Sequence, residues 1–206
     1  NDTANTLKFQ YPNLAGAWST GGNLNNARSV IAAAGTQTAA LAFGGYTSPH
    51  NYTESYNGTN WTEVNDLTSS KAFRAGSGVQ TSALCYGGSN SGNTESWNGT
   101  NWTEVADLGV ARRFLAGAGV SNTSALAFGG NLDPPPAAVT NTELWGGSSW
   151  TAVAHMNNNH MNMGGGGTAT SAIVMGNANP ADANTEIWNG SSWTEVNNLN
   201  QAAAAR

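Results

Sequence analysis

The chain has 206 residues, of which only 9% are charged, and its formal net charge is −5. It lacks the clustered lysines and arginines that would neutralise phosphates, so nucleic acid is not an expected partner. No apolar run approaches the roughly 20 residues needed to cross a bilayer, and we expect no membrane insertion. Asparagine, threonine and serine make the surface polar in place of charge, which favours an extracellular or virion-surface protein.

One stretch occurs four times and organises the chain. Each copy runs from Thr-Glu, through an aromatic residue two positions after the glutamate and then Asn-Gly or Gly-Gly, to a tryptophan; the copies begin at Thr53, Thr94, Thr142 and Thr185. Because Asn-Gly and Gly-Gly readily take the positive φ angles of a type I′ turn, each copy predicts a β-hairpin. The tryptophan recurs every 41 to 48 residues, at Trp18, Trp61, Trp102, Trp150 and Trp193. A period in this range indicates a repeat architecture.

In chain order, residues 1–8 are polar and aperiodic, which predicts a linker or arm. Residues 9–23 carry Trp18 without a Thr-Glu strand before it, which predicts a lone outer strand. Four units follow, at about 24–66, 67–107, 108–155 and 156–198, and residues 9–206 are expected to form a single domain. The final residues, 199–206, align with the opening of a further unit.

Each unit contains four segments that predict strands. A cation stands ten residues after the preceding tryptophan, at Arg28, Lys71, Arg112 and His160. A run of alanine and glycine follows at the same phase in every unit, which predicts a strand that other backbones approach closely. An apolar run typical of a strand covered on both faces comes next, and the Thr-Glu and tryptophan strands complete the unit. Four strands in about 45 residues describe one blade of a β-propeller, so we predict an all-β propeller of four blades with the alanine-glycine strand innermost.

The sequence leaves two ways to finish the ring. The tryptophan strand occurs five times, whereas the other three strands occur four times. One possibility is a closed four-bladed ring with residues 9–23 as an extra N-terminal strand, and the other is a segment of a larger propeller. A narrow axis suits strands of glycine and alanine, which favours the closed ring.

The order of cation, apolar strand, Gly-Gly, aromatic residue and tryptophan resembles the kelch repeat of galactose-oxidase-like propellers, over roughly residues 18–198. The fourth unit departs from it, with Gly176-Asn177 in place of Gly-Gly and His160 in place of arginine. The repeated Asn-Gly-Thr/Ser-x-Trp-Thr wording is also similar to kelch-like arrays of marine bacteriophage virion proteins, which implies a virion or tail-fibre setting. The copper-radical chemistry of galactose oxidase is not carried over, because Cys85 lies inside a predicted buried strand.

The residues that could carry chemistry are mostly periodic. One glutamate recurs seven residues before each tryptophan, and a group repeated around a ring is expected to be structural, paired with Arg28, Lys71, Arg112 or backbone amides. The residues assigned to this structural repeat are Glu54, Glu95, Glu143, Glu186, Trp61, Trp102, Trp150 and Trp193. A stretch of histidines and methionines, residues 155–163, has soft copper-type ligands. Its members align with leucine and arginine of other units, so we expect no metal and no cofactor.

The connections at one end of the predicted propeller are nearly identical between units, whereas those at the other end vary. Loops on a rigid scaffold commonly carry binding, although drift in unconstrained loops would produce the same variation. The candidate ligand-binding residues in the variable loops are Tyr46, His50, Tyr52, Asn90, Asp133 and Asp182. The unique acids Asp133 and Asp182 follow no pattern of paired carboxylates for glycoside hydrolysis.

We therefore predict a non-enzymatic recognition module for receptor binding or adhesion that engages a host surface glycan or protein. A purely structural virion or filament component in contact with other subunits is one alternative, and a glycan-active enzyme is the other.

Overall fold

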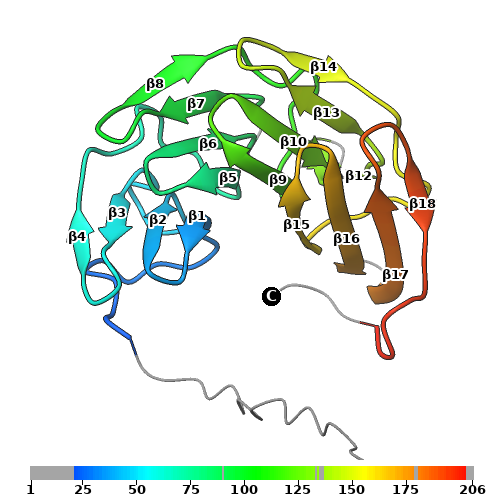
Figure 1. Cartoon of the computed structure of the whole chain (residues 1–206), viewed down its shortest axis with the longest axis horizontal. Coiled ribbons are helices and arrows are strands. Elements are labelled where there is room, and N and C mark those ends of the chain that lie inside the picture. The colour runs from blue at the N-terminus through cyan, green and yellow to red at the C-terminus, as the bar shows by residue number, and fades with distance from the viewer. Residues whose placement is uncertain (1–20, 90, 133, 135–136, 179–180, 203–206) are drawn as a thin grey trace, which may run out of the picture.

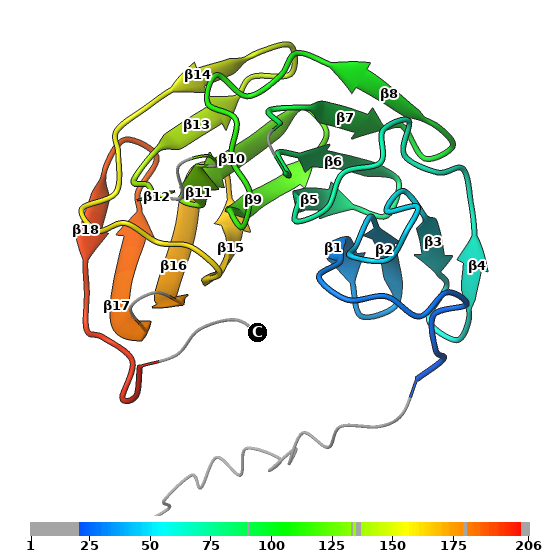
Figure 2. The same cartoon turned by 180° about the vertical axis from the view of Figure 1, so that it is seen from behind.

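The computed structural model describes residues 21–89, 91–132, 134, 137–178 and 181–202. The chain is all-β: four antiparallel four-stranded sheets stand side by side in an arc, like the blades of a propeller (Figures 1 and 2). No helix occurs in the described residues, and so none that could span a membrane. We number these sheets blades 1 to 4 in chain order.

The strands of each blade follow one another in sequence from the inside of the arc outward. Blade 1 contains β1 (Ala32–Thr36), β2 (Ala39–Phe43), β3 (Thr53–Tyr56) and β4 (Trp61–Glu63). Blade 2 contains β5 (Ala75–Val79), β6 (Ser82–Tyr86), β7 (Thr94–Trp97) and β8 (Trp102–Val105). Blade 3 contains β9 (Ala116–Ser121), β10 (Ser124–Phe128), β13 (Thr142–Trp145) and β14 (Trp150–Ala152), with a small hairpin of β11 (Asn131–Leu132) and β12 (Ala137–Ala138). Blade 4 contains β15 (Gly164–Thr168), β16 (Ser171–Ala178), β17 (Ala181–Trp188) and β18 (Trp193–Glu195).

The alanine-glycine strands β1, β5, β9 and β15 lie innermost, as predicted (Figure 1). Their small residues are required because an aromatic ring of the preceding blade lies against the backbone. A Cβ atom built on Gly117 would lie 1.8 Å from the Tyr86 hydroxyl, and one built on Gly76 would lie 2.5 Å from the Phe43 ring. Glycine serves here for close approach of a ring, since neither residue has a positive φ.

The core lies between neighbouring blades. We call the side of a blade toward the following blade its exit face and the opposite side its entry face. Phe43 on the exit face of blade 1 makes an edge contact with Trp102 on the entry face of blade 2, with ring centroids 4.9 Å apart. Trp102 Nε1 also donates a hydrogen bond of 3.0 Å to Thr53 Oγ1. The same arrangement recurs in Tyr86–Trp150–Thr94 and Phe128–Trp193–Thr142.

The arc is open. Each of the three core clusters joins two consecutive blades, and within the described residues no cluster joins blade 4 to blade 1. Figures 1 and 2 show β15–β18 and β1–β4 standing apart across the opening. The closed ring that the sequence favoured is therefore not observed. Residues 1–20, which hold the predicted arm, Trp18 and most of the predicted extra strand, lie outside the described residues.

The hairpin turns between the third and fourth strands differ from the predicted type I′. Asn57 Oδ1 accepts hydrogen bonds from the backbone N–H groups of Thr59 (3.0 Å) and Asn60 (2.9 Å). Only the central glycine, Gly58, has a positive φ, of 93°. The asparagine side chain thus caps the turn in blade 1, and one left-handed glycine is sufficient even in blade 3, where Gly146 replaces the asparagine.

The fourth blade departs from the others at Gly176-Asn177. In the other blades the second glycine of this pair has a φ between 105° and 121°, which side-chain-bearing residues rarely adopt. Asn177 does not adopt such an angle, and β16 and β17 instead continue as eight-residue strands in which Asn177 pairs with Asp182. The buried Asn177 side chain accepts from Met161 N (3.1 Å) and donates to Asn159 O (3.2 Å), which holds this longer hairpin against the loop before β15.

We predict that Gly165→Ala destabilises the fold, because the new Cβ would lie 2.9 Å from the buried Phe128 ring. Overpacking of this kind costs about 1–3 kcal/mol in the free energy of unfolding, measured by urea denaturation. Gly166→Ala in the same strand is the control, since its Cβ would meet nothing within 4 Å. Equal stability of the two variants would contradict the close contact between inner strand and ring.

Candidate functional site

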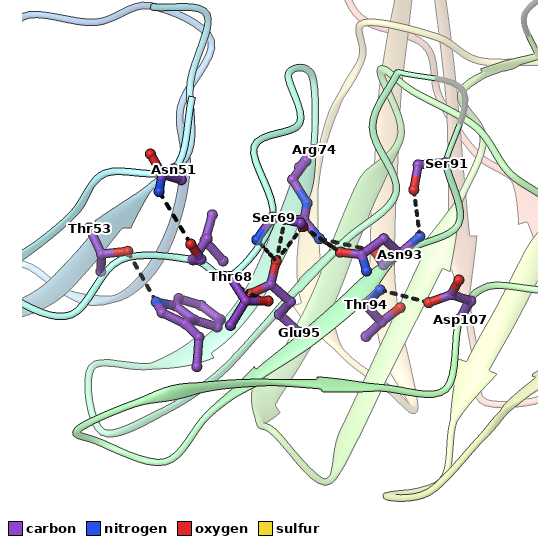
Figure 3. Close-up of polar contacts among 12 residues, drawn as sticks. Asn51, Thr53, Thr68, Ser69, Arg74, Ser91, Asn93, Thr94, Glu95 and Asp107 are labelled. Carbon is purple, nitrogen blue, oxygen red and sulfur yellow. Dashed lines mark hydrogen bonds and ion pairs between the residues drawn. The ribbon is translucent and has the colours of Figure 1, made fainter. Parts of the chain in front are cut away.

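One buried glutamate in the third strand of each blade holds the loop that leads into that blade. Glu95 accepts hydrogen bonds from the backbone N–H groups of Thr68 (2.6 Å) and Ser69 (3.2 Å) and from the Arg74 guanidinium (2.9 Å), as Figure 3 shows. Glu54, Glu143 and Glu186 make the equivalent contacts with backbone amides and with Arg28, Arg112 and His160. The predicted pairing of these glutamates with cations or backbone amides is confirmed.

The prediction that Lys71 is the cation beside Glu95 in blade 2 is wrong. Arg74, three residues after Lys71, occupies the position beside Glu95 and is buried. Its guanidinium donates to Glu95, to the Ser69 hydroxyl (3.2 Å) and to the Asn93 carbonyl (3.1 Å). A planar fork can reach several acceptors at once, whereas a lysine ammonium is a single point charge, which explains why the arginine fills the site.

The environment of Glu95 favours its charged form. Burial alone would raise the pKa of this carboxyl group, but hydrogen bonds from Ser69 and Arg74 outweigh that effect, and the pKa is lowered from its ordinary value of 4.5. In blade 3 burial lowers the pKa of Arg112, opposed by its hydrogen bond and charge pairing with Glu143. The carboxylates of Glu95 and Glu143 thus hold the loops that lead into their blades.

Three aromatic side chains gather where the variable loops and the loops before the inner strands meet. Tyr46 stacks on Phe73 with ring centroids 5.0 Å apart, and Phe73 contacts Phe114 at 4.5 Å. The Arg113 guanidinium lies 5.1 Å from the Phe114 centroid and 5.8 Å from that of Phe73. His50 also stacks on Tyr46, at 5.8 Å. We call Tyr46, Phe73 and Phe114 the aromatic row; the Tyr46 side of it is open to solvent, since Tyr46 is 57% exposed.

The backbone at this row is strained. Phe73 and Phe114 occupy the same repeat position as Val30 and Asn162, and all four have a positive φ, between 49° and 63°. Left-handed geometry is a genuine outlier for bulky and β-branched residues and is retained mainly where the surroundings enforce it, often at functional sites. Here successive blades enforce it: Phe114 N donates to Phe73 O (3.2 Å) and Asn162 N donates to Phe114 O (3.1 Å).

These four positions line a cavity of about 240 Å³ near the axis. The remaining lining residues are Ile31, Arg74, Leu115 and Met163, which follow the strained positions in their loops. The cavity therefore takes one pair of side chains from each blade. Its wall is mostly apolar, with Arg74 and Asn162 as the polar members, which is the usual character of a ligand-binding pocket.

The structure brings together only part of the predicted ligand-binding set. Tyr46 and His50 join the aromatic row. The carbonyl of the half-buried Tyr52 accepts from Gly44 N (3.0 Å) and from the Arg28 guanidinium, so its backbone belongs to the loop-holding network. Asp182 lies in β17, where its carboxylate accepts from Asn184 N (3.1 Å). Asn90 and Asp133 lie outside the described residues.

Sequence reasoning missed Phe73, Phe114 and Arg113. Their signal is a position two residues after the aligned cation that is aromatic in units 2 and 3 but valine and asparagine in units 1 and 4. Such a departure inside an otherwise regular segment marks a residue that the blade itself does not require.

Other candidate groups are packed into the core. Trp102 and Trp193 are buried between blades, and Met156 and Met163 belong to the cluster between blades 3 and 4. Cys85 is fully buried, and burial raises its pKa to about 12, so the thiol is protonated at neutral pH. A second axial cavity, of about 330 Å³, is lined by glycine, alanine, serine and threonine of the four blades, none of which is charged.

Comparison with known proteins identifies no related family model or curated protein. A scan against protein-family models finds no match, and no curated protein shows significant similarity to the chain. The functional conclusion therefore rests on the geometry of the chain itself.

We predict that Arg74→Met destabilises the protein by about 3–5 kcal/mol, because it leaves the Glu95 charge buried without its partner. Lys71→Met should change the free energy of unfolding by less than about 0.5 kcal/mol, as is usual for a substitution outside such a network. Urea denaturation of both variants measures the difference. A larger loss for Lys71→Met than for Arg74→Met would restore the original assignment.

The lowered pKa of Glu95 predicts how stability depends on pH. The carboxylate stabilises the fold above its unfolded-state value near 4.5, and this contribution is lost as the pH falls through the lower folded-state pKa. Glu95→Gln should cost about 1–3 kcal/mol at pH 7, and the gap to the wild type should narrow at more acidic pH. Melting temperatures measured from pH 7 to pH 2 test this, with the exposed Glu104→Gln as control. A gap that stays constant to the lowest pH would contradict it.

Proposed function

We propose that the chain is a kelch-like propeller segment that serves as a non-enzymatic recognition module, with the aromatic row as its contact surface for a host glycan. The observation that carries this proposal is the row itself: the loops of three successive blades present Tyr46, Phe73 and Phe114, with Phe73 in contact with both of the others, on the face of the arc where the loops vary.

A glycan fits this surface for physical reasons. Aromatic faces bury large apolar area, and the C–H faces of sugar rings offer matching flat apolar surface. The Tyr46 hydroxyl and the polar groups of His50 and Asn162 stand near the row and can hydrogen-bond sugar hydroxyls. The strained backbone and the stacking of Arg113 over the phenylalanines hold the row in place before a ligand arrives, which reduces the entropic cost of binding.

Six of the described carboxylates are held in structural contacts, which supports recognition over hydrolysis. The four repeated glutamates are buried and bonded to loops, and Asp66 and Asp107 accept hydrogen bonds from the backbone N–H groups of Thr53 (2.9 Å) and Thr94 (3.2 Å). A polar surface with few charges suits an extracellular or virion-surface adhesion protein, such as a tail-fibre element. A structural role among virion or filament subunits is a second candidate, favoured by the faces of blades 1 and 4 on which no other blade packs within the described residues.

A glycan array probed with the purified chain tests the proposal. We expect binding to a subset of glycans, and for a bound glycan we expect Tyr46→Ala and Phe73→Ala to weaken affinity about tenfold or more, or about 1.4 kcal/mol. Val120→Ala is the control, because Val120 is exposed on β9 and takes no part in the row. Melting temperatures show that each variant is folded. Binding that survives Tyr46→Ala unchanged, or an array with no bound glycan, would reject a glycan-binding row.

A further inference from the structure

The exit face of blade 4 repeats a surface that is buried in the other three blades, and within the described residues no other blade packs on it. Ile173, Met175, Ile187, Val196 and Leu199 form this face. At the positions of Ile173 and Met175 the other blades carry Leu41, Leu84, Leu126, Phe43, Tyr86 and Phe128, all of them fully buried. On blade 4 Ile187 is 41% exposed and Val196 is 37% exposed. Within the described residues, the exit face of blade 4 is thus a partly exposed apolar patch.

Within the described residues no other blade packs on the entry face of blade 1 either. Tyr56 and Trp61 occupy the positions of Trp97 and Trp102, but they are half-buried where those tryptophans are buried. Ala33 of the inner strand is exposed, although the equivalent glycines of other blades each lie against a ring. The two ends of the arc are therefore the two halves of the interface that the chain already makes three times.

Both ends of the arc carry the hydrogen-bonding groups that the internal interfaces use. Thr94 Oγ1 donates to Gly92 O (3.3 Å) and accepts from Trp150 Nε1 (3.0 Å). Thr185 Oγ1 on blade 4 makes the same donation, to Ala183 O (3.3 Å). Its free lone pairs lie where the tryptophan of a following blade would donate. Trp61 Nε1 on blade 1 donates to none of the described residues.

The side chains at the two ends of the arc also match in size. Each internal interface sets a glycine against an aromatic side chain, and a Cβ on that glycine would lie between 1.8 and 2.9 Å from the nearest atom of that side chain. At the ends of the arc both partners change together: the glycine position holds Ala33, and the ring position holds Met175. The unbranched, flexible thioether leaves room for the extra methyl group.

A groove on blade 4 completes the match. Between blades 1 and 2 the Gln80 amide crosses over to donate to Ala40 O (3.4 Å), Ser55 Oγ (3.0 Å) and the Tyr56 carbonyl. The equivalent residues of blade 4, Ala172, Ile187 and Trp188, line an open groove of about 420 Å³. The glutamine at this repeat position on blade 1 is Gln37, which is exposed.

We infer that a second copy of this chain docks head to tail, with the entry face of its blade 1 packed on the exit face of blade 4. In the complex Trp61 of one copy donates to Thr185 of the other, Gln37 enters the groove, and Ala33 packs on Met175. The interface is heterologous, so further copies can add until a ring closes or a filament grows.

A pair of variants blocked on opposite faces tests this arrangement. Ile187→Arg places a charge on the exit face, and Ala33→Arg places one on the entry face; both sites are exposed, so each chain should fold with wild-type melting temperature. In sedimentation and light scattering over a wide concentration range, the wild type should associate beyond its 21.1 kDa monomer mass. Each variant alone should remain a monomer. An equimolar mixture should form a complex of one copy of each and stop there, because its outer faces are blocked.

Val120→Arg is the matched control, since it adds the same charge at an exposed residue outside both faces and should associate like the wild type. A wild type that stays monomeric would overturn the inference. If Ile187→Arg also lowers the melting temperature in that case, the exit face of blade 4 is covered by the chain itself, through ring closure or a terminal segment. Variants that still self-associate, or a mixture that stays monomeric, would equally exclude head-to-tail docking.

Discussion

The contact between an aromatic ring and a glycine of the next inner strand determines the rest of the arrangement. The side chain of Phe43, Tyr86 or Phe128 can approach the next blade this closely only where that blade has no side chain. The inner strands must therefore be built from the smallest residues, which places them nearest the axis. The same ring meets the outer tryptophan of the next blade, whose indole N–H bonds to a threonine. This contact thus determines the composition of the inner strand, the position of the outer tryptophan and which face of a blade packs on the next blade.

The buried glutamates extend this order from the strands to the loops. A carboxylate deep in the third strand accepts the N–H groups of the loop that enters the same blade, and a cation from that loop balances its charge. The loop is then rigid enough to hold Phe73 and Phe114 in left-handed geometry beside Tyr46. A buried ionic network that adds little net stability can still be kept because it fixes loop conformation, and the aromatic row depends on that fixation.

Most periodic features were predictable from the sequence, the hairpin turn type being an exception, and singular features were not. The inner strands and the pairing of the glutamates follow from residues that recur at one phase, because each blade repeats the same physical environment. Arg74 replaced Lys71 since geometry, and not alignment, decides which cation reaches Glu95. The longer hairpin at Asn177 depends on a φ angle that the residue avoids. The open arc depends on the rotation between blades, which no local pattern encodes, and the aromatic row is formed by positions that break the repeat.

At each internal junction the preceding repeat supplies the ring and the threonine, and the following repeat supplies the glycine and the tryptophan. The repeat is therefore modular in an evolutionary sense. Unequal crossing-over between two repeats would lengthen or shorten the arc by one whole blade. Each new junction would inherit its ring, glycine, tryptophan and threonine from existing units, without compensating substitutions elsewhere. The number of blades can therefore change over generations while the packing at every junction stays constant, and the span of the variable loop face would change in steps of one repeat.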